Sequence, residues 1–170
     1  INRGNLSKIF GELFMLIEKD KRGIELQLLY SDENFSVPAN VYIIGMMNTA
    51  DRSLAMLDYA LRRRFSFFTM KPGFNAPGFQ AYQDSLKSDD FNKLIACVKQ
   101  LNSKIAEDIS LGEGFCIGHS YFCSLTPETA NTQTLSSIVE YELIPLLKEY
   151  WFDEPANVID WGDRLRSAVK

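Results

Sequence analysis

Glycine followed by lysine is absent from this sequence. None of its ten glycines precedes a lysine, so the chain lacks the G-x-x-x-x-G-K-[ST] loop that holds the phosphates of a nucleoside triphosphate. Gly112, Gly114 and Gly118 are spaced as G-x-G-x-x-x-G, which is one residue too long for the dinucleotide-binding fingerprint. These residues therefore contain neither of the two common glycine-rich phosphate-binding loops.

Metal-binding residues and long apolar runs are also scarce. The chain has one histidine and three cysteines with no C-x-x-C pair, so we predict no metal site. An odd number of cysteines and the absence of a signal-peptide pattern predict a reducing, cytoplasmic location. The longest uncharged run, residues 34–50, is interrupted by Pro38 and three asparagines, and we predict no membrane span.

The chain has slightly fewer basic than acidic residues, and the acidic excess lies in its second part. The formal net charge is −4, which excludes a polycationic surface over the whole molecule. Residues 1–70 hold nine Lys or Arg and eight Asp or Glu, whereas residues 71–170 hold nine and fourteen. A turn signal, Lys71-Pro72-Gly73, lies at this change. We predict two parts, residues 1–72 and 73–170.

The first part has the pattern of an α/β domain. Asn5 is a good N-cap for a helix that continues towards Gly23. The apolar run at residues 41–47 predicts a strand buried on both faces, as in a parallel sheet. A short helix and a second apolar run, residues 65–70, suggest a right-handed crossover. The remaining predicted elements are a short strand at residues 25–30, its possible partner at 34–37 and a helix at about 54–63.

The second part has helical periodicity. Its clearest stripe recurs every three to four residues between Phe91 and Ile105. Pro145 should bend a helix at residues 135–150 because proline has no backbone N–H to donate. Residues 112–124 break the pattern and predict a loop or small hairpin. Two further helices are predicted around residues 79–86 and 158–168. The predicted fold class is thus α/β plus α. Because a parallel sheet of two strands cannot stand alone, the sequence suggests the back portion of a larger domain.

The densest polar cluster directly follows the best predicted strand, as Asn48-Thr49-Ala50-Asp51-Arg52-Ser53. Ligands of open α/β sheets bind at the carboxyl ends of strands. An asparagine amide there can contact a phosphate oxygen and orient a water. The alternative is an Asx-type turn with a serine helix cap and an Asp–Arg surface pair.

A second cluster, Arg62-Arg63-Arg64, closes the short predicted helix. Cations at a helix C-terminus stabilise it through the helix dipole, by roughly 0.3–1 kcal/mol each. That is a sufficient structural reason for arginine here. The functional alternative is that at least one guanidinium reaches a phosphate, as an arginine finger does.

Several segments resemble the McrB-type family of AAA+ proteins, the GTP-hydrolysing subunits of 5-methylcytosine restriction systems. Residues 1–13, INRGNLSKIFGEL, resemble the segment after the Walker B acidic pair. Residues 47–53, MNTADRS, match the family signature at the sensor-1 position. Residues 57–65, LDYALRRRF, match its arginine-finger helix, and residues 114–122, GFCIGHSYF, resemble a motif of its helical lid. The resemblance runs from residue 1 to about 151.

The resemblance implies a role for individual residues. Asn48 would be the sensor that orients the attacking water, with Asp51 fixing that loop or contacting the next subunit. Arg62 and Arg63 would be the candidates to reach the γ-phosphate held by an adjacent subunit. The implied nucleotide-binding positions are Asn48, Thr49, Arg3 and His119. A lone histidine between glycine and serine also has a structural alternative.

The resemblance also implies a partial AAA+ domain: the C-terminal strands of the core at residues 1–72 and a helical lid at 73–170. The expected ligand is GTP or ATP with Mg²⁺, and the main binding loop lies outside this chain. The expected partners are further copies of the full-length protein in a hexameric ring, a nuclease subunit of the McrC type, and DNA bound through other domains.

Two other functions fit the same residues. One is an ATP-driven remodelling module of the MoxR-like kind, and the other is a non-catalytic domain that binds an anionic or protein partner. Since the P-loop and Walker B residues are missing, we expect residues 1–170 alone to hydrolyse no nucleotide.

Overall fold

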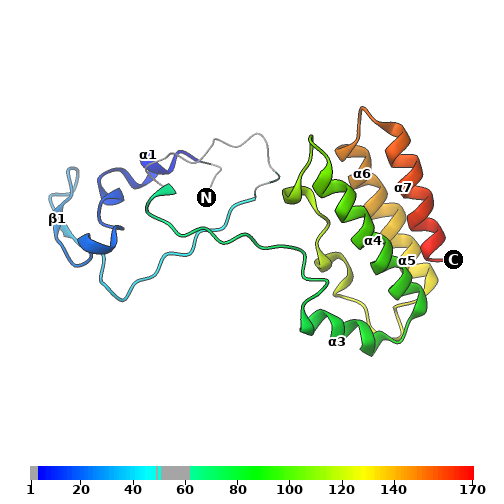
Figure 1. Ribbon diagram of the computed structural model, residues 1–170. Coiled ribbons are helices and arrows are strands. Elements are labelled where there is room, and N and C mark those ends of the chain that lie inside the picture. The colour runs from blue at the N-terminus through cyan, green and yellow to red at the C-terminus, as the bar shows by residue number, and fades with distance from the viewer. Residues whose placement is uncertain (1–3, 49, 51–61) are drawn as a thin grey trace. The chain divides into compact units, whose positions relative to one another are not determined.

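The computed structural model describes residues 4–48, 50 and 62–170. The chain divides into two compact units, Ile1–Thr69 and Met70–Lys170, which are drawn from blue to green and from green to red in Figure 1. Each unit is described by itself below. The domain border predicted after residue 72 lies close to this division and stays a prediction.

The N-terminal unit begins with helix α1 (Leu6–Phe10), and the predicted N-cap is confirmed. The Oδ1 atom of Asn5 accepts a hydrogen bond from the Lys8 backbone N–H at 3.0 Å. The regular helix is shorter than predicted, since it passes at Gly11 into a 3₁₀ turn, η1 (Gly11–Phe14). Gly11 has φ +51°, a conformation that glycine adopts without strain and that interrupts an α-helix. A second 3₁₀ turn, η2 (Lys19–Lys21), follows.

A small antiparallel sheet follows in this unit. Strand β1 (Leu26–Gln27) pairs with β2 (Asn34–Phe35), with Leu26 opposite Phe35 and Gln27 opposite Asn34. The predicted pairing of the segments at 25–30 and 34–37 is confirmed. Both strands are shorter than predicted.

The two predicted parallel strands are not formed. Residues 41–47 and 65–70 carry no strand, and several of their side chains are exposed, among them Ile44 at 90% and Phe68 at 89%. A strand is stabilised by hydrogen bonds to a neighbouring strand, and a parallel sheet needs both faces covered. No described segment of the chain pairs with either run. The helix predicted at 54–63 lies outside the described residues except at its last two positions.

The C-terminal unit is helical, as predicted. In Figure 1, α4, α6 and α7 run beside one another, and α7 contacts both α4 and α6. The predicted loop or hairpin at residues 112–124 holds two 3₁₀ turns, η3 (Glu113–Phe115) and η4 (His119–Phe122), and no strand. The five α-helices described in this unit are α3 (Pro77–Leu86), α4 (Asp89–Glu107), α5 (Thr132–Ile138), α6 (Ile144–Tyr150) and α7 (Pro155–Ala168).

Helix α4 supplies the centre of the core. The Ser88 hydroxyl caps its first turn by accepting a hydrogen bond from Phe91 N. Its predicted apolar stripe is confirmed, because every member is at most 1% exposed: Phe91, Leu94, Ile95, Val98, Leu101 and Ile105. Trp151, Phe122 and Leu165 from other elements pack into the same core. Burial of this stripe fixes the position of α4 among the other helices.

The helix type changes just before Pro145, while the predicted bend itself stays a prediction. A π-helical turn, Val139–Leu143, separates α5 from α6 directly before Pro145. A proline removes one i to i−4 hydrogen bond, and its ring would clash with the carbonyl of Tyr141 in a regular α-helix. The wider π turn relieves that clash without ending the helical path.

Candidate functional site

Asn48 lies in a tight turn after the apolar run. Its Oδ1 atom accepts a hydrogen bond from the Ala50 backbone N–H at 3.0 Å, which is the Asx-type turn given above as the structural alternative. The residue is exposed. The side-chain oxygen thus shapes the loop that follows. Three other predicted site residues lie outside the described residues: Arg3, Thr49 and Asp51.

The three adjacent arginines occupy different environments. The Arg64 side chain is only 10% exposed. Its guanidinium forms an ion pair with the Glu18 carboxylate and lies over the Phe14 ring, 4.2 Å from the ring centre. A cation over an aromatic face is stabilised by the ring quadrupole. Arg64 is therefore held within the N-terminal unit.

Arg62 and Arg63 are more accessible. The Arg63 side chain is 64% exposed, and its Nη2 atom lies 3.8 Å from Glu18 Oε1. Arg62 is also exposed, and its guanidinium carbon lies 5.8 Å from the centre of the Phe67 ring. Sequence reasoning missed Glu18 and Phe14, although their spacing of four residues in a predicted helix could have indicated a shared face.

His119 is built into the packing of the C-terminal unit. Its Nδ1 atom accepts a hydrogen bond from the Gly73 backbone N–H at 2.9 Å, so Nδ1 carries no proton. The ring meets Phe74 and Phe79 edge-to-face, at centroid distances of 6.2 and 5.7 Å. A Cβ atom at Gly73 would lie 2.9 Å from the imidazole. This geometry favours the structural alternative for His119, and its nucleotide-facing role stays a prediction.

The motif around His119 is anchored by Asn102 of α4, which sequence reasoning missed. The Asn102 side chain donates to the Ile117 carbonyl oxygen at 2.9 Å and accepts from the Ile117 N–H at 2.7 Å. The amide thus pairs with both backbone groups of one residue, as a neighbouring strand would. A polar amide beside the buried stripe of α4 was the available signal.

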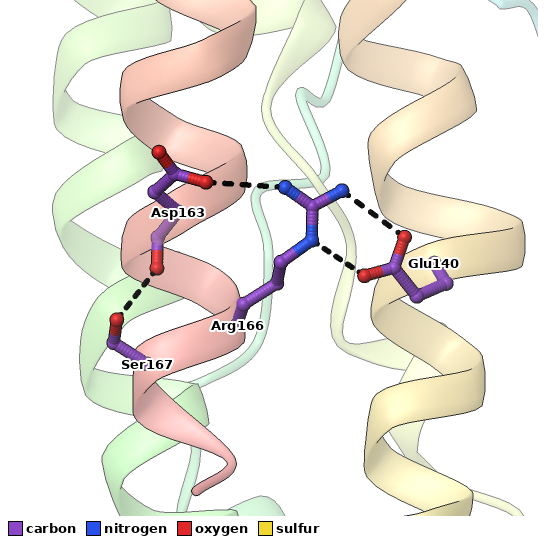
Figure 2. Close-up of polar contacts among 4 residues, drawn as sticks. All are labelled: Glu140, Asp163, Arg166 and Ser167. Carbon is purple, nitrogen blue, oxygen red and sulfur yellow. Dashed lines mark hydrogen bonds and ion pairs between the residues drawn. The ribbon is translucent and has the colours of Figure 1, made fainter.

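The two arginines of the C-terminal unit are paired within it. Figure 2 shows Arg166 of α7 between two carboxylates: Glu140, contacted at 2.6 and 3.1 Å, and Asp163 at 3.2 Å. The hydrogen bond from Arg166 lowers the pKa of Glu140. Arg164 lies 3.0 Å from Asp160 and stacks over Trp161. In this structure Arg166 joins α7 to the π turn, as a bidentate arginine–carboxylate pair does.

Asp108 closes the end of α4. Its carboxylate accepts hydrogen bonds from the Ser110 hydroxyl at 2.7 Å, the Ser110 N–H at 2.8 Å and the Trp151 indole N–H at 2.8 Å. The Ser110 hydroxyl, followed by the Trp151 indole, lowers the pKa of Asp108 to about 2. Hydrogen bonds to the ionised form are the cause.

The described residues show no metal centre and no membrane helix. Within residues 4–48, 50 and 62–170, no group of three His, Cys, Asp or Glu side chains is placed to hold a metal ion. Over the same residues, no helix has the length and apolar character needed to cross a membrane.

Two protein families match separate parts of the chain. Residues 1–65 match the AAA domain of the dynein-related subfamily. Residues 93–159 match the family described as the McrB alpha-helical lid domain. The second match falls within the helical unit and spans α4 to the start of α7.

Two curated relatives agree with these matches. The chain is 50% identical over 97% of its length to the type IV methyl-directed restriction enzyme EcoKMcrB subunit of Escherichia coli K12. It is 29% identical over 68% of its length to the type II restriction enzyme BsuMI component YdiS of Bacillus subtilis 168. The chain spans 38% and 40% of these relatives, respectively. It belongs to the McrB-type family of AAA+ proteins, with a partial AAA+ core followed by the family's α-helical lid.

Proposed function

We propose that this chain is the C-terminal part of the nucleoside triphosphatase subunit of a methylcytosine-dependent DNA restriction system. The observation that carries the proposal is the 50% identity, over 97% of the chain, to the subunit of a methyl-directed restriction enzyme. Asn48 acts as the sensor for the attacking water, and Arg62 or Arg63 acts as the arginine finger.

The substrate is GTP or ATP with Mg²⁺, and GTP is the proposed preference. Arg62 and Arg63 fit the charge of a triphosphate because both are exposed, adjacent cations. The sequence contains no G-x-x-x-x-G-K-[ST] loop, so we propose that the main nucleotide-binding loop, with its Mg²⁺, lies outside this chain.

The chain contributes positioning and charge to hydrolysis. The transferred phosphoryl group gains charge on its outer oxygens in the transition state, and an arginine supplied by a neighbouring subunit accelerates the reaction by about 10³–10⁵-fold. An asparagine amide can orient the attacking water. Because a finger acts on the site of the next subunit, the proposal requires a closed ring, for which we propose a hexamer.

The remaining partners follow from the same proposal. A nuclease subunit of the McrC type cuts the DNA, and other domains recognise the modified base. The location is the cytoplasm, where DNA and nucleotide are both available.

Substitution of the sensor tests the enzymatic role. In the full-length protein that carries this segment, Asn48→Ala should lower kcat by about 10²–10³-fold, the usual effect of removing one transition-state contact. Asn40→Ala is the matched control, because Asn40 is an exposed loop asparagine of the same unit. Unchanged turnover in the Asn48 variant would support a non-catalytic binding domain instead.

Two assays test the other parts of the proposal. Purified residues 1–170 should show no nucleotide turnover, and measurable turnover without an added partner would contradict it. In the full-length protein, unlabelled GTP should compete with labelled nucleotide more strongly than ATP does. A preference for ATP would instead favour the remodelling function.

A further inference from the structure

Glu18 lies where it can act on two of the three adjacent arginines. Its Oε1 atom forms the ion pair with Arg64 and lies 3.8 Å from Arg63 Nη2. The carboxylate is partly shielded, with 27% of its side chain exposed. One carboxylate thus links the segment after the first 3₁₀ turn to two of the adjacent arginines.

The surroundings of Arg64 hold its side chain in place, and in this sense we call it an anchor. A guanidinium that is mostly withdrawn from water needs a charge partner and a surface to pack on. Glu18 supplies the charge and Phe14 supplies the surface. Moving Arg64 to a phosphate on another subunit would break both contacts and leave Glu18 without its closest cation. The backbone next to Arg63 is therefore fixed through Arg64.

Arg63 is held much more loosely. Its side chain is 64% exposed, and its distance to Glu18 is at the outer limit of an ion pair. Ion pairs of this kind contribute little because water screens them. A triphosphate carries several negative charges and can draw Arg63 from Glu18 without disturbing Arg64.

We propose that Glu18 is a positioning residue for the arginine finger, and that Arg64 is its anchor. Glu18 fixes the backbone at Arg63 and Arg64 through its ion pair with Arg64, and keeps Arg63 directed towards the subunit boundary until a phosphate binds it. The proposal rests on the function proposed above, because it presumes that Arg62 or Arg63 completes the site of a neighbouring subunit.

The first test is Glu18→Gln in the full-length protein, with Glu33→Gln as the matched control. Both remove one carboxylate from the same unit, and Glu33 is exposed. A finger that is misplaced but present should lower kcat on the order of tenfold or more, since small displacements of a catalytic group are costly. The KM for nucleotide should stay unchanged, because the finger acts in the transition state. A kcat equal to that of the control overturns the proposal.

A mixing experiment tests in which subunit Glu18 acts. Glu18→Gln subunits should regain turnover when mixed with subunits whose own nucleotide site is disabled but whose Glu18 is native, because the latter donate a well-placed finger. Disabled subunits that also carry Glu18→Gln should fail to restore it. Equal rescue by both kinds of subunit overturns the positioning role.

Arg64→Lys separates an anchor from a finger and serves if Glu18→Gln does not fold. Lysine keeps the charge but lacks the planar group that stacks on Phe14. An anchor variant should lower both kcat and the thermal midpoint of unfolding. Full loss of turnover at an unchanged midpoint would identify Arg64 as the finger and overturn the proposal.

Arg62→Ala and Arg63→Ala distinguish this inference from the proposed function. If neither substitution changes turnover, the arginine-finger function itself fails. If one of them abolishes turnover while Glu18→Gln and Arg64→Lys retain wild-type kcat, only the roles given to Glu18 and Arg64 fail.

Discussion

Tyr82 shows how one hydroxyl joins separate parts of the lid. Its oxygen lies 2.7 Å from the Phe122 carbonyl oxygen, and it accepts a hydrogen bond from Leu125 N–H at 3.0 Å. Tyr82→Phe should lower the free energy of unfolding by about 1–3 kcal/mol, because partly buried backbone groups lose their partner. Denaturant unfolding measures the change. Tyr141→Phe is the control, since Tyr141 is 80% exposed, and an equal loss in both variants would contradict the role of Tyr82.

Asp108 makes lid stability depend on acid pH. Its folded-state pKa, about 2, lies below the ordinary 3.8, so its ionised form stabilises the fold above about pH 4. That contribution is lost as pH falls through the folded pKa. Between pH 3.8 and about 2, unfolding free energy should therefore decline more steeply in the wild type than in Asp108→Asn.

Asp108 is not the only carboxyl group described that contributes to the loss of stability in acid. Asp90, Glu128 and Glu140 also have lowered pKa values, so the Asp108 variant should keep part of the decline. Asp153→Asn, at an exposed aspartate near Trp151 in the sequence, is the control and should keep the wild-type slope. Equal slopes for the wild type and Asp108→Asn would contradict the assignment.

The sequence alone does not distinguish the roles of the three adjacent arginines. Arg62, Arg63 and Arg64 are identical in the sequence, and either a dipole-stabilising or a phosphate-binding role fits all three. Their environments separate them, because Phe14 and Glu18 surround only Arg64 closely. Contacts between residues almost fifty positions apart cannot be inferred from local spacing.

At the scale of the element, the end of α3 carries a conformational cost. Lys87, its C-cap, has φ +50° and ψ +37°, a left-handed conformation that disfavours side chains with a Cβ atom. Lys87→Gly should raise the unfolding free energy of the lid by about 0.5–1 kcal/mol, measured by denaturant titration. Ala96→Gly, at an exposed interior position of α4, is the opposite-sign control and should lower it by about 1 kcal/mol. A decrease for Lys87→Gly would contradict the conformational argument.

The sequence predicted the helices better than the strands. The stripe of α4 was predicted correctly because a helix satisfies its backbone internally and needs only one covered face. The apolar run at residues 41–47 predicted a strand, yet no described segment pairs with it. A strand depends on a neighbour, and β propensity alone does not provide one.

At the scale of the molecule, the core is concentrated in one unit. Among the residues before Met70 whose side-chain exposure is described, only Leu16 and Ile17 are buried apolar residues, whereas the C-terminal unit buries a continuous cluster around α4. A fragment of residues 70–170 should therefore unfold cooperatively by itself, because burial of apolar surface is the main favourable term in folding. Thermal unfolding followed by circular dichroism measures this.

Residues 1–69 provide the matching comparison. We expect this fragment to show no cooperative transition, since many of its large apolar side chains are exposed. A sharp transition in residues 1–69 together with none in 70–170 would contradict the assignment of the core.

The sequence by itself determined the helical lid, its apolar stripe, the family and the candidate site residues, because periodicity and short motifs are local properties of a chain. Tertiary structure decided that Arg64 is enclosed while Arg62 and Arg63 are exposed, that His119 packs on Gly73, and that Asn102 holds the lid motif. Each of those outcomes depends on which distant groups come within hydrogen-bonding or packing distance. A side chain acquires its burial and its hydrogen-bond or ion-pair partners only when the chain folds. Side chains of the same residue type can therefore take different roles.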